Sequence, residues 1–213
     1  MKRIFAFLAL CGLALAAPVI TLSAQTPEEI IAKMDKEMER TDAEGLYMVM
    51  EMKIPILGNF PSKIWSLGKK ARAEMEVKDK KSILWLDETT SWDYDVIKNE
   101  VTITNRDQSK SSDADNNKEM LTGITEGYKV TLQKETADAW YFRCNKSASN
   151  PKKDDPKRMD LIVSKANYMP ISLSTKASGL TITIRDAAIG VTEEQVTFDP
   201  SKYPGITVID KRQ

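Results

Sequence analysis

Three aspartates are the first side chains in this chain that could carry out chemistry. Asp87, Asp93 and Asp95 lie close together in the sequence. Two carboxylates can act as the acid and the nucleophile of glycoside hydrolysis. All three, however, border short turns, where aspartate is favoured because its carboxylate accepts hydrogen bonds from the backbone. We therefore interpret them as turn residues and keep a carboxylate hydrolase as the least favoured class of function.

Metal-dependent chemistry has little support in the sequence. Asp113-x-Asp115-x-Asn117 resembles the start of a calcium loop, but Lys118 stands where glycine is needed and Ile124 where glutamate is needed. The chain has no histidine, the commonest general base and zinc ligand. We expect no enzyme activity, no metal and no cofactor.

The N-terminal residues are typical of an export signal. Lys2 and Arg3 precede the apolar run 4–17, which is shorter than the roughly 20 residues that a membrane-spanning helix needs. Small residues then offer cleavage sites at 14–16 or at 22–24. We favour cleavage after Ala24, with a retained membrane anchor as the alternative.

Removal of residues 1–24 would leave one domain, 25–213, with a single cysteine. Cys11 lies within the apolar run and follows Leu10 instead of the small residue that lipid attachment requires, so we do not expect a lipid-modified cysteine. Cys144 cannot then form an internal disulfide. We interpret it as a small buried apolar group on a strand, and a reactive thiol is the alternative.

Charge and composition narrow the classes of partner. Lysine plus arginine equal aspartate plus glutamate, 31 each, so no global field favours nucleic acid or an anionic membrane. The chain is 41% hydrophobic, which suits a domain with a core. The loop 145–157 contains balanced charges and predicts a solvated loop, as does the polar run 106–118.

A single amphipathic helix is predicted near the start of the mature chain. Thr26, Pro27 and Glu29 provide an N-cap, a first-turn proline and a capping box. Apolar residues at helical spacing then form one stripe, and the helix should end near Thr41, ahead of Gly45. The stripe consists of Ile30, Ile31, Met34 and Met38.

The first predicted strand, residues 46–56, has an unusual apolar face. Its even positions are all apolar and include three methionines: Leu46, Met48, Met50, Met52, Ile54 and Ile56. Methionine is flexible and is over-used where a surface must fit varied apolar partners. Ordinary core filling is one interpretation of this face, and an adaptable wall that contacts lipid or peptide is the other.

Short β-prone runs fill the rest of the chain. Residues 81–104 read as a three-strand meander with large aromatic side chains, and residues 71–77 alternate between apolar and charged. Residues 58–61 predict a turn, and residues 119–124 a short helical turn. Further strands are predicted at 63–67, 127–134, 139–144, 159–163, 171–176, 180–184 and near 206–209. About ten or eleven strands at this spacing predict an antiparallel meander in a barrel or sandwich.

The order of these features resembles the periplasmic outer-membrane lipoprotein carrier family, which is LolA-like. The resemblance rests on Trp92-x-Tyr94-Asp95, on 101–103, and on an ending that runs from Phe198-Asp199-Pro200 to 204–208. It implies an incomplete β-barrel of curved antiparallel sheet, covered by the N-terminal helix and short helical segments. The apolar side would shelter the acyl chains of lipoproteins and pass them to an outer-membrane receptor.

One feature departs from the family. Its carrier branch uses an arginine near residues 65–72 to hold a lid, but the run 67–72 lacks the arginine–proline pairing, and alternation places Arg72 on the charged face. Related branches bind lipids or envelope proteins without carrying lipoproteins.

We therefore expect a monomeric periplasmic carrier of lipoproteins or other acylated ligands, with a protein-binding envelope sensor or scaffold as the alternative. No nucleic-acid partner is expected. The predicted ligand-binding residues are Met34, Met38, Met48, Met50, Met52, Ile54, Trp65, Met75, Trp85, Trp92 and Tyr94.

Overall fold

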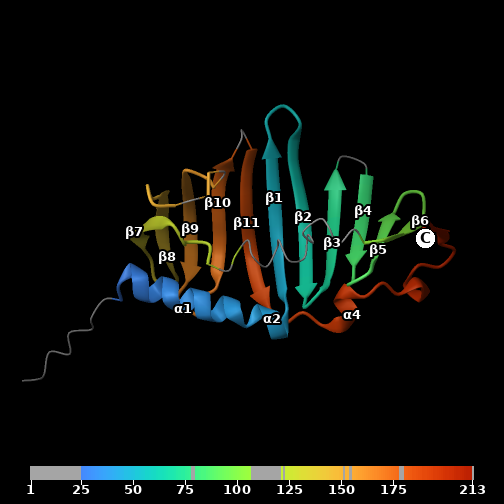
Figure 1. The fold of residues 1–213 in the computed structure, drawn as a ribbon, viewed down its shortest axis with the longest axis horizontal. Helices are drawn as coiled ribbons and strands as arrows, with labels where there is room; N and C mark the ends of the chain where they lie inside the picture. Colours follow the sequence, from blue (N-terminus) through green and yellow to red (C-terminus); the bar gives the residue numbers. More distant parts are fainter. Residues whose placement is uncertain are drawn as a thin grey trace, which may run out of the picture.

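The fold is an open, curved sheet with short helices along one end of its strands (Figure 1). The computed structural model describes residues 25–77, 80–106, 121, 123–150, 152–153, 155–177 and 180–212. The expected fold class, a mainly β incomplete barrel with a helical cover, is confirmed. The predicted signal at 1–24, the calcium-like run 113–117 and half of the predicted turn at 119–124 lie outside the described residues.

The elements follow one another with short connections over most of the described chain. The helices are α1 (Pro27–Glu39), α2 (Thr41–Glu44), α4 (Glu193–Val196) and the 3-10 turn η1 (Pro200–Lys202). The first six strands are β1 (Leu46–Ile54), β2 (Gly58–Leu67), β3 (Lys70–Val77), β4 (Lys80–Leu86), β5 (Thr90–Asp95) and β6 (Glu100–Asn105). The others are β7 (Tyr128–Glu135), β8 (Ala139–Lys146), β9 (Arg158–Ser164), β10 (Pro170–Ala177), β11 (Leu180–Ile189) and β12 (Thr207–Asp210).

Twelve described strands form one sheet in the order β12-β6-β5-β4-β3-β2-β1-β11-β10-β9-β8-β7. Neighbouring strands are antiparallel, except that β12 runs parallel to β6. The sheet therefore has one strand more than the upper end of the predicted range, and its last strand is parallel. The central pairing of β1 with β11 joins the first and second halves of the chain.

Helix α1 begins as its sequence predicts. The Thr26 side chain accepts a hydrogen bond from the Glu29 backbone N–H, the Glu29 side chain accepts one from the Thr26 backbone N–H, and Pro27 occupies the first turn. The four apolar stripe residues are all buried, and they pack in one cluster with β1, β2 and β8 to β11. No helix within the described ranges is long and apolar enough to cross a membrane.

The sheet has two faces of different chemistry. We call the face that contacts α1 the inner face; it carries Met48 and Ile64, which pack with the helix. The outer face carries Trp65, Trp85 and the other odd-numbered positions of β1, β2 and β4. Because side chains alternate along each strand, the register assigns every residue of these strands to one face.

The β1–β2 connection differs from the predicted one. Strand β1 ends at Ile54 and not at residue 56, and the predicted turn at 58–61 is the start of β2. Proline is tolerated in β2 because pairing with β3 begins only at Ser62, so Pro61 has β1 as a neighbour on one side and no ladder partner on the other. The turn itself consists of residues 55–57.

Candidate functional site

Burial of the inner face falls along β1 from the helix end toward the hairpin. Leu46 and Met48 are 1% and 0% exposed, and they belong to the packed core. Met50, Met52 and Ile54 are only partly buried. Strand β3 shows the same trend, because Ala71 is 4% exposed and Met75 is 38% exposed. The helical cover therefore ends before the apolar face does.

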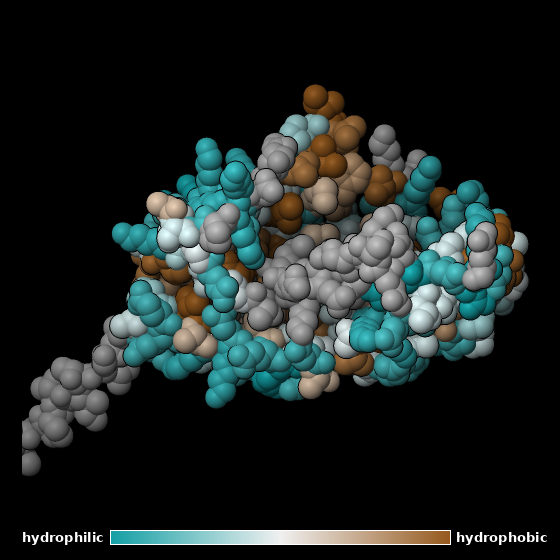
Figure 2. All heavy atoms as spheres, in the orientation of Figure 1, coloured by the Kyte–Doolittle hydropathy of each residue, from teal (hydrophilic) through white to brown (hydrophobic). Residues whose placement is uncertain are grey.

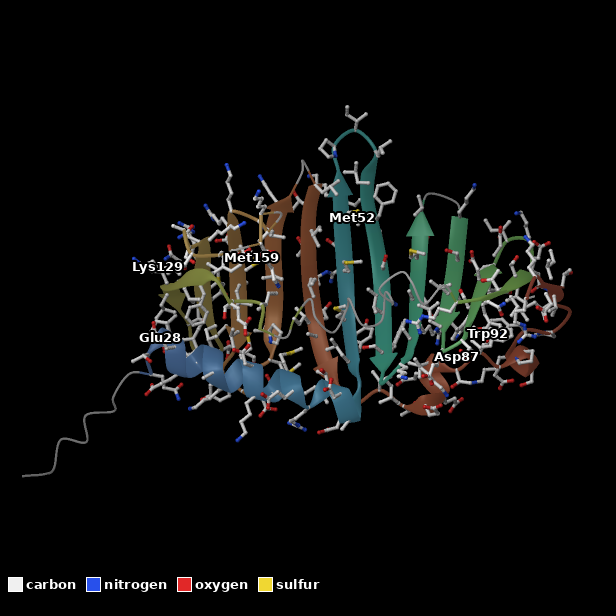
Figure 3. The ribbon with its side chains drawn as sticks, in the orientation of Figure 1. Glu28, Met52, Asp87, Trp92, Lys129 and Met159 are labelled. Carbon is white, nitrogen blue, oxygen red and sulfur yellow. The ribbon has the colours of Figure 1, made fainter. Side chains whose placement is uncertain are left out.

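We call the part of this face that the described helices leave uncovered the apolar wall. Its residues come from four adjacent strands, and they are Met50, Met52, Ile54, Phe60, Met75 and Ile182. Strand pairing brings them together, since Met52 lies directly opposite Phe60 on β2 and Ile182 on β11. Figure 3 labels Met52 near the hairpin end of β1, and Figure 2 shows hydrophobic side chains gathered over this hairpin.

Most of the wall is distinct from the packed core. Met50 packs against the main cluster, but the other five wall residues belong to none of the core clusters found among the described residues. Met34 and Met38, predicted as ligand-binding residues, are 0% exposed and form the core beneath the wall together with Met48. Core filling thus holds near the helix, whereas near the hairpin the face is partly exposed, and a wall that contacts lipid or peptide stays a prediction for that part.

The apolar wall carries no charge, whereas the outer face of the same strands does. Glu51 pairs with Arg185 across β1 and β11 at 2.7 Å. Lys53 and Lys63 also lie on the outer face. An acyl chain on the inner face would meet the apolar side chains of the wall and Ser62, which lies between Met50 and Met75. Burial of the acyl chain is worth about 0.8 kcal/mol per methylene.

The predicted aromatic site residues lie on the opposite face from the methionines. Trp65, Trp85, Trp92 and Tyr94 all point to the outer face. Figure 3 shows Trp92 far from Met52, toward the β6 edge of the sheet. Residue type alone placed these side chains in one predicted site; the structure instead separates the aromatic residues from the methionines of β1.

A closing segment of the chain covers three of these aromatic residues. Phe198 stacks near Trp92 with ring centroids 6.0 Å apart, and it meets Trp85 edge-on at 5.2 Å. Tyr203 lies 4.8 Å from Tyr94 and 5.7 Å from Trp85. The Phe–Asp–Pro ending that carries the family resemblance therefore has a packing role: it covers the outer face of β4 to β6.

Arg72 lies on the outer face, as its alternation predicted. Its guanidinium carbon lies 5.0 Å from the Trp65 ring and 5.6 Å from the Trp85 ring, and it pairs with Glu74. Cation–π contacts of this kind fix the arginine against the sheet. Arg72 thus stabilises the face opposite the apolar wall, where it cannot contact a cover over the wall.

A hollow with a volume of about 350 Å³ lies on the outer face of β1 to β3. Its lining includes Lys63, Glu74, Lys81 and Arg185. A lining so rich in charge does not fit an acyl chain, because covering charged side chains with an apolar chain removes their hydration and costs free energy. We therefore place the candidate site on the apolar wall.

Two of the three aspartates considered for hydrolysis hold turns in place, whereas Asp93 lies within β5, which corrects its interpretation as a turn residue. Asp87 accepts hydrogen bonds from the backbone of Thr89 and Thr90 at 2.8 and 2.7 Å. Asp95 accepts bonds from the backbone of Ile97 and Lys98, and the Lys98 backbone bond, followed by its side chain, lowers the pKa of Asp95. Asp93 is exposed on the inner face, on β5.

Cys144 lies on β8 with 0% exposure, which confirms its predicted burial. Desolvation by burial raises the pKa of its thiol to about 11. The thiolate is the reactive form, so this thiol is inert near neutral pH. Among the described residues, no group of three acidic, cysteine or histidine side chains could hold a metal ion.

Two alanine substitutions will distinguish core methionines from wall methionines. Met48→Ala should lower the free energy of unfolding by about 2–5 kcal/mol, because it leaves a cavity in a fully packed site. Met52→Ala should cost about 1 kcal/mol or less, because Met52 is partly exposed on the wall. Urea unfolding monitored by tryptophan fluorescence measures both. Equal losses would show that the wall is packed as tightly as the core.

Asp35 on α1 should make a pH-dependent contribution to the stability of the fold. Burial, and then the nearby charges of Glu126 and Glu39, raise the pKa of Asp35, and its Oδ1 has no hydrogen-bond partner among the described residues. An acid with a raised folded pKa loses stability as pH rises above its unfolded pKa of about 3.9. Asp35→Asn should therefore raise Tm at neutral pH, with the gain vanishing below pH ~3.

Exposed Asp138 provides the control for this experiment. Asp138→Asn makes the same chemical change away from α1, and its Tm should follow the wild-type protein across the pH range. A Tm gain for Asp35→Asn that persisted in acid would contradict a charge effect.

Comparisons with known proteins bear on the fold. No protein-family model matches the chain, and no curated protein matches it. LprF from Mycobacterium bovis is structurally similar, with a TM-score of 0.55 at 10% identity over 81% of this chain and 97% of LprF. Lipoprotein LppX from Mycobacterium tuberculosis gives a TM-score of 0.47 at 8% identity, over 76% and 95%. A LolA superfamily protein from Nitrosomonas europaea gives 0.32 at 10% identity, over 84% and 100%.

The protein has the open curved sheet with an N-terminal helix that the resemblance in its sequence implied, and it shares this fold with LprF. The similarity to LprF, together with the curved sheet and its N-terminal helix, carries this conclusion. At such low identity the similarity extends to the architecture and not to a ligand.

Proposed function

We propose that the protein is a periplasmic carrier or binder of lipoproteins or other acylated ligands, and that the apolar wall holds the acyl chain. The observation that carries the proposal is a charge-free, half-exposed wall at the end of the inner face that α1 leaves uncovered. The core methionines Met34, Met38 and Met48 lie next to the wall, at the helix end of the same face, and in this proposal they do not contact the ligand. The proposal includes export by a cleaved signal at 1–24 and a monomeric mature protein.

The wall suits a ligand that must be both held and released. Methionine has three rotatable bonds and a polarizable sulfur, so Met50, Met52 and Met75 can adapt to chains of different shape. A wall open at one edge also leaves the polar part of an acylated protein in water. These properties support a transport role over a permanent structural lipid.

Binding of a palmitoylated peptide tests the proposal. The peptide carries a fluorescent label on its polar end, and the label reports binding. The protein should bind the palmitoylated peptide and should not bind the same peptide without its acyl chain. Acyl binding would be contradicted if the protein bound both peptides with equal affinity, or if it bound neither of them.

A protein-binding sensor or scaffold is the second candidate, and strand β7 is the observation that bears on it. β7 lies at the edge of the sheet and pairs only with β8 among the described strands, so its other side could accept a partner strand. Lys129 and Lys134 are exposed on this edge, and the register shifts between Leu132 and Lys134. Such charges and irregularities protect edges from strand addition, so the carrier is favoured.

A further inference from the structure

The tip of the β1–β2 hairpin exposes large apolar side chains. Ile56 is 106% exposed and Leu57 is 64% exposed, and Pro55 beside them is also exposed. The hairpin projects beyond the neighbouring strand ends in Figure 1, and Figure 2 shows it as a hydrophobic tip. Its apolar surface is therefore presented to the surroundings and contributes nothing to the core.

The backbone of this tip is strained as well. Ile56 has φ = 73°, a left-handed conformation in which a β-branched residue is an outlier. Asparagine, aspartate or glycine would fit such a turn position at lower cost and would keep it soluble. An exposed isoleucine at a strained position costs free energy in two ways: its apolar surface stays in water, and its backbone is in an unfavourable conformation. Backbone strain of this kind is concentrated at functional sites.

Basic side chains surround the tip. Four exposed lysines stand at this end of the sheet, on β1, β4 and β10: Lys53, Lys80, Lys81 and Lys176. Within the described residues none of the four forms a salt bridge. Glu76 is an exposed carboxylate near them on β3, opposite Lys81. Farther along, Asp95 pairs with Lys98 at 3.3 Å.

The opposite end of the strands is acidic. Residues 27–44, which contain α1 and α2, have seven carboxylates and three basic side chains. α4 carries Glu193 and Glu194, but these pair with Lys70 and Lys202, so the surplus of carboxylates comes from residues 27–44. The balanced net charge therefore conceals a polarity along the strands, with lysines around the apolar tip and carboxylates around the helices. An anionic surface would attract the tip end and repel the helix end.

We infer that the β1–β2 hairpin docks the protein on lipid bilayers that contain anionic lipids, with Ile56 and Leu57 inserted among the headgroups and the lysines above them contacting lipid phosphates. Apolar insertion and basic residues together are what interfacial binding requires. The tip is a narrow projection that fits a deformable bilayer surface. Ile54 and Phe60 connect it to the apolar wall on the same two strands, but docking does not depend on the proposed acyl binding.

Vesicle flotation tests this inference with the mature protein recovered from the cell envelope, its first residue checked by mass. The protein should float with phosphatidylethanolamine vesicles that contain phosphatidylglycerol, and should stay behind with neutral phosphatidylcholine vesicles. Ile56→Asn combined with Leu57→Asn should weaken flotation at least tenfold, on the order of what losing two buried apolar groups implies. Ile97→Asn is the matched control, because Ile97 is 64% exposed in the β5–β6 turn, and it should float like the wild type.

Three outcomes would overturn the inference. They are no flotation of the wild-type protein with either vesicle, equal flotation of the double variant, and equal loss in the Ile97 control. A purified protein partner that binds the wild type and not the double variant, without vesicle binding, would instead identify the tip as a protein-docking site.

A dye at the tip gives a second measurement. Cys144 is 0% exposed, so a thiol-reactive, environment-sensitive dye will label Leu57→Cys selectively. Its emission should shift to the blue with phosphatidylglycerol vesicles, while a dye on Ile97→Cys should not shift. An unshifted Leu57→Cys emission while the protein floats would overturn insertion of the tip. Loss of acyl-peptide binding with flotation intact would contradict only the proposed carrier function.

Discussion

Replacing Gly45 by alanine should destabilise the protein by roughly 3 kcal/mol. Gly45 connects α2 to β1 with φ = 77°, where a side chain is strained. An added Cβ would lie 2.6 Å from the Val191 Cβ and 2.7 Å from the Ser66 carbonyl oxygen. The alanine must therefore push apart β2, the start of β1 and the segment before α4.

The matched control is Gly68→Ala, which also has a positive φ, 54°, but no atom within 4 Å of an added Cβ. It carries the conformational cost alone, about 1 kcal/mol. Urea unfolding followed by tryptophan fluorescence should show the difference at an unchanged m-value. Equal losses for the two alanines would mean that the close approach around Gly45 does not hold the sheet to its closing segment.

Placing one charge on the apolar wall should abolish acyl binding. Met52→Asp puts a carboxylate between Phe60 and Ile182, where an acyl chain would have to cover it. Covering an unpaired charge costs several kcal/mol, so the Kd for a palmitoylated peptide should rise at least about a hundredfold. Stability should change much less, because Met52 is partly exposed in the folded protein.

Asn59→Asp is the control for this charge. Asn59 is an exposed neighbour of Phe60 on β2, and alternation directs it to the outer face. The two variants have the same net charge, and their added carboxylates lie on adjacent strands but on opposite faces. The proposal expects Asn59→Asp to bind the peptide like the wild type. If both variants lost affinity for the peptide to the same extent, the cause would be a general electrostatic effect and not a charge on the wall.

Local patterns in the sequence predict the elements well. The capping box at Thr26, the helical stripe and the alternation of β1 as far as Ile54 are short-range features, and each appears in the structure where the spacing placed it. The alternation that directs Arg72 to the charged face holds for the same reason. Patterns of period 2 and period 3.6 depend only on neighbours within one strand or helix. They therefore predict these elements without knowledge of how the elements pack.

The site depends on contacts that these patterns do not contain. Ile182 joins the wall because β11 pairs with β1, over a sequence distance that no local pattern spans. Trp85 and Trp92 belong to the other face because Phe198 and Tyr203 return to cover them. The alternation Leu180, Ile182, Ile184 was a usable signal for a half-buried strand, but it does not name the partner strand.

The β1–β2 hairpin shows a second limit of prediction from the sequence. Ile56 continues the apolar alternation of β1, so the pattern extended the strand to residue 56. The chain instead turns at 55–57, with Ile56 in the left-handed region. Sequence rules expect glycine or asparagine there, and a function that uses exposed isoleucine overrides them.

Native mass spectrometry of the protein purified gently from the cell envelope is the most direct test of acyl binding by the apolar wall. The wall should carry an acylated molecule, seen as a mass above that of the chain and released as lipid or lipopeptide on activation. Wild-type protein stripped of lipid should regain such a mass with a palmitoylated peptide, and Met52→Asp should not. A wild-type protein that carries no acylated molecule and takes up none would contradict the account.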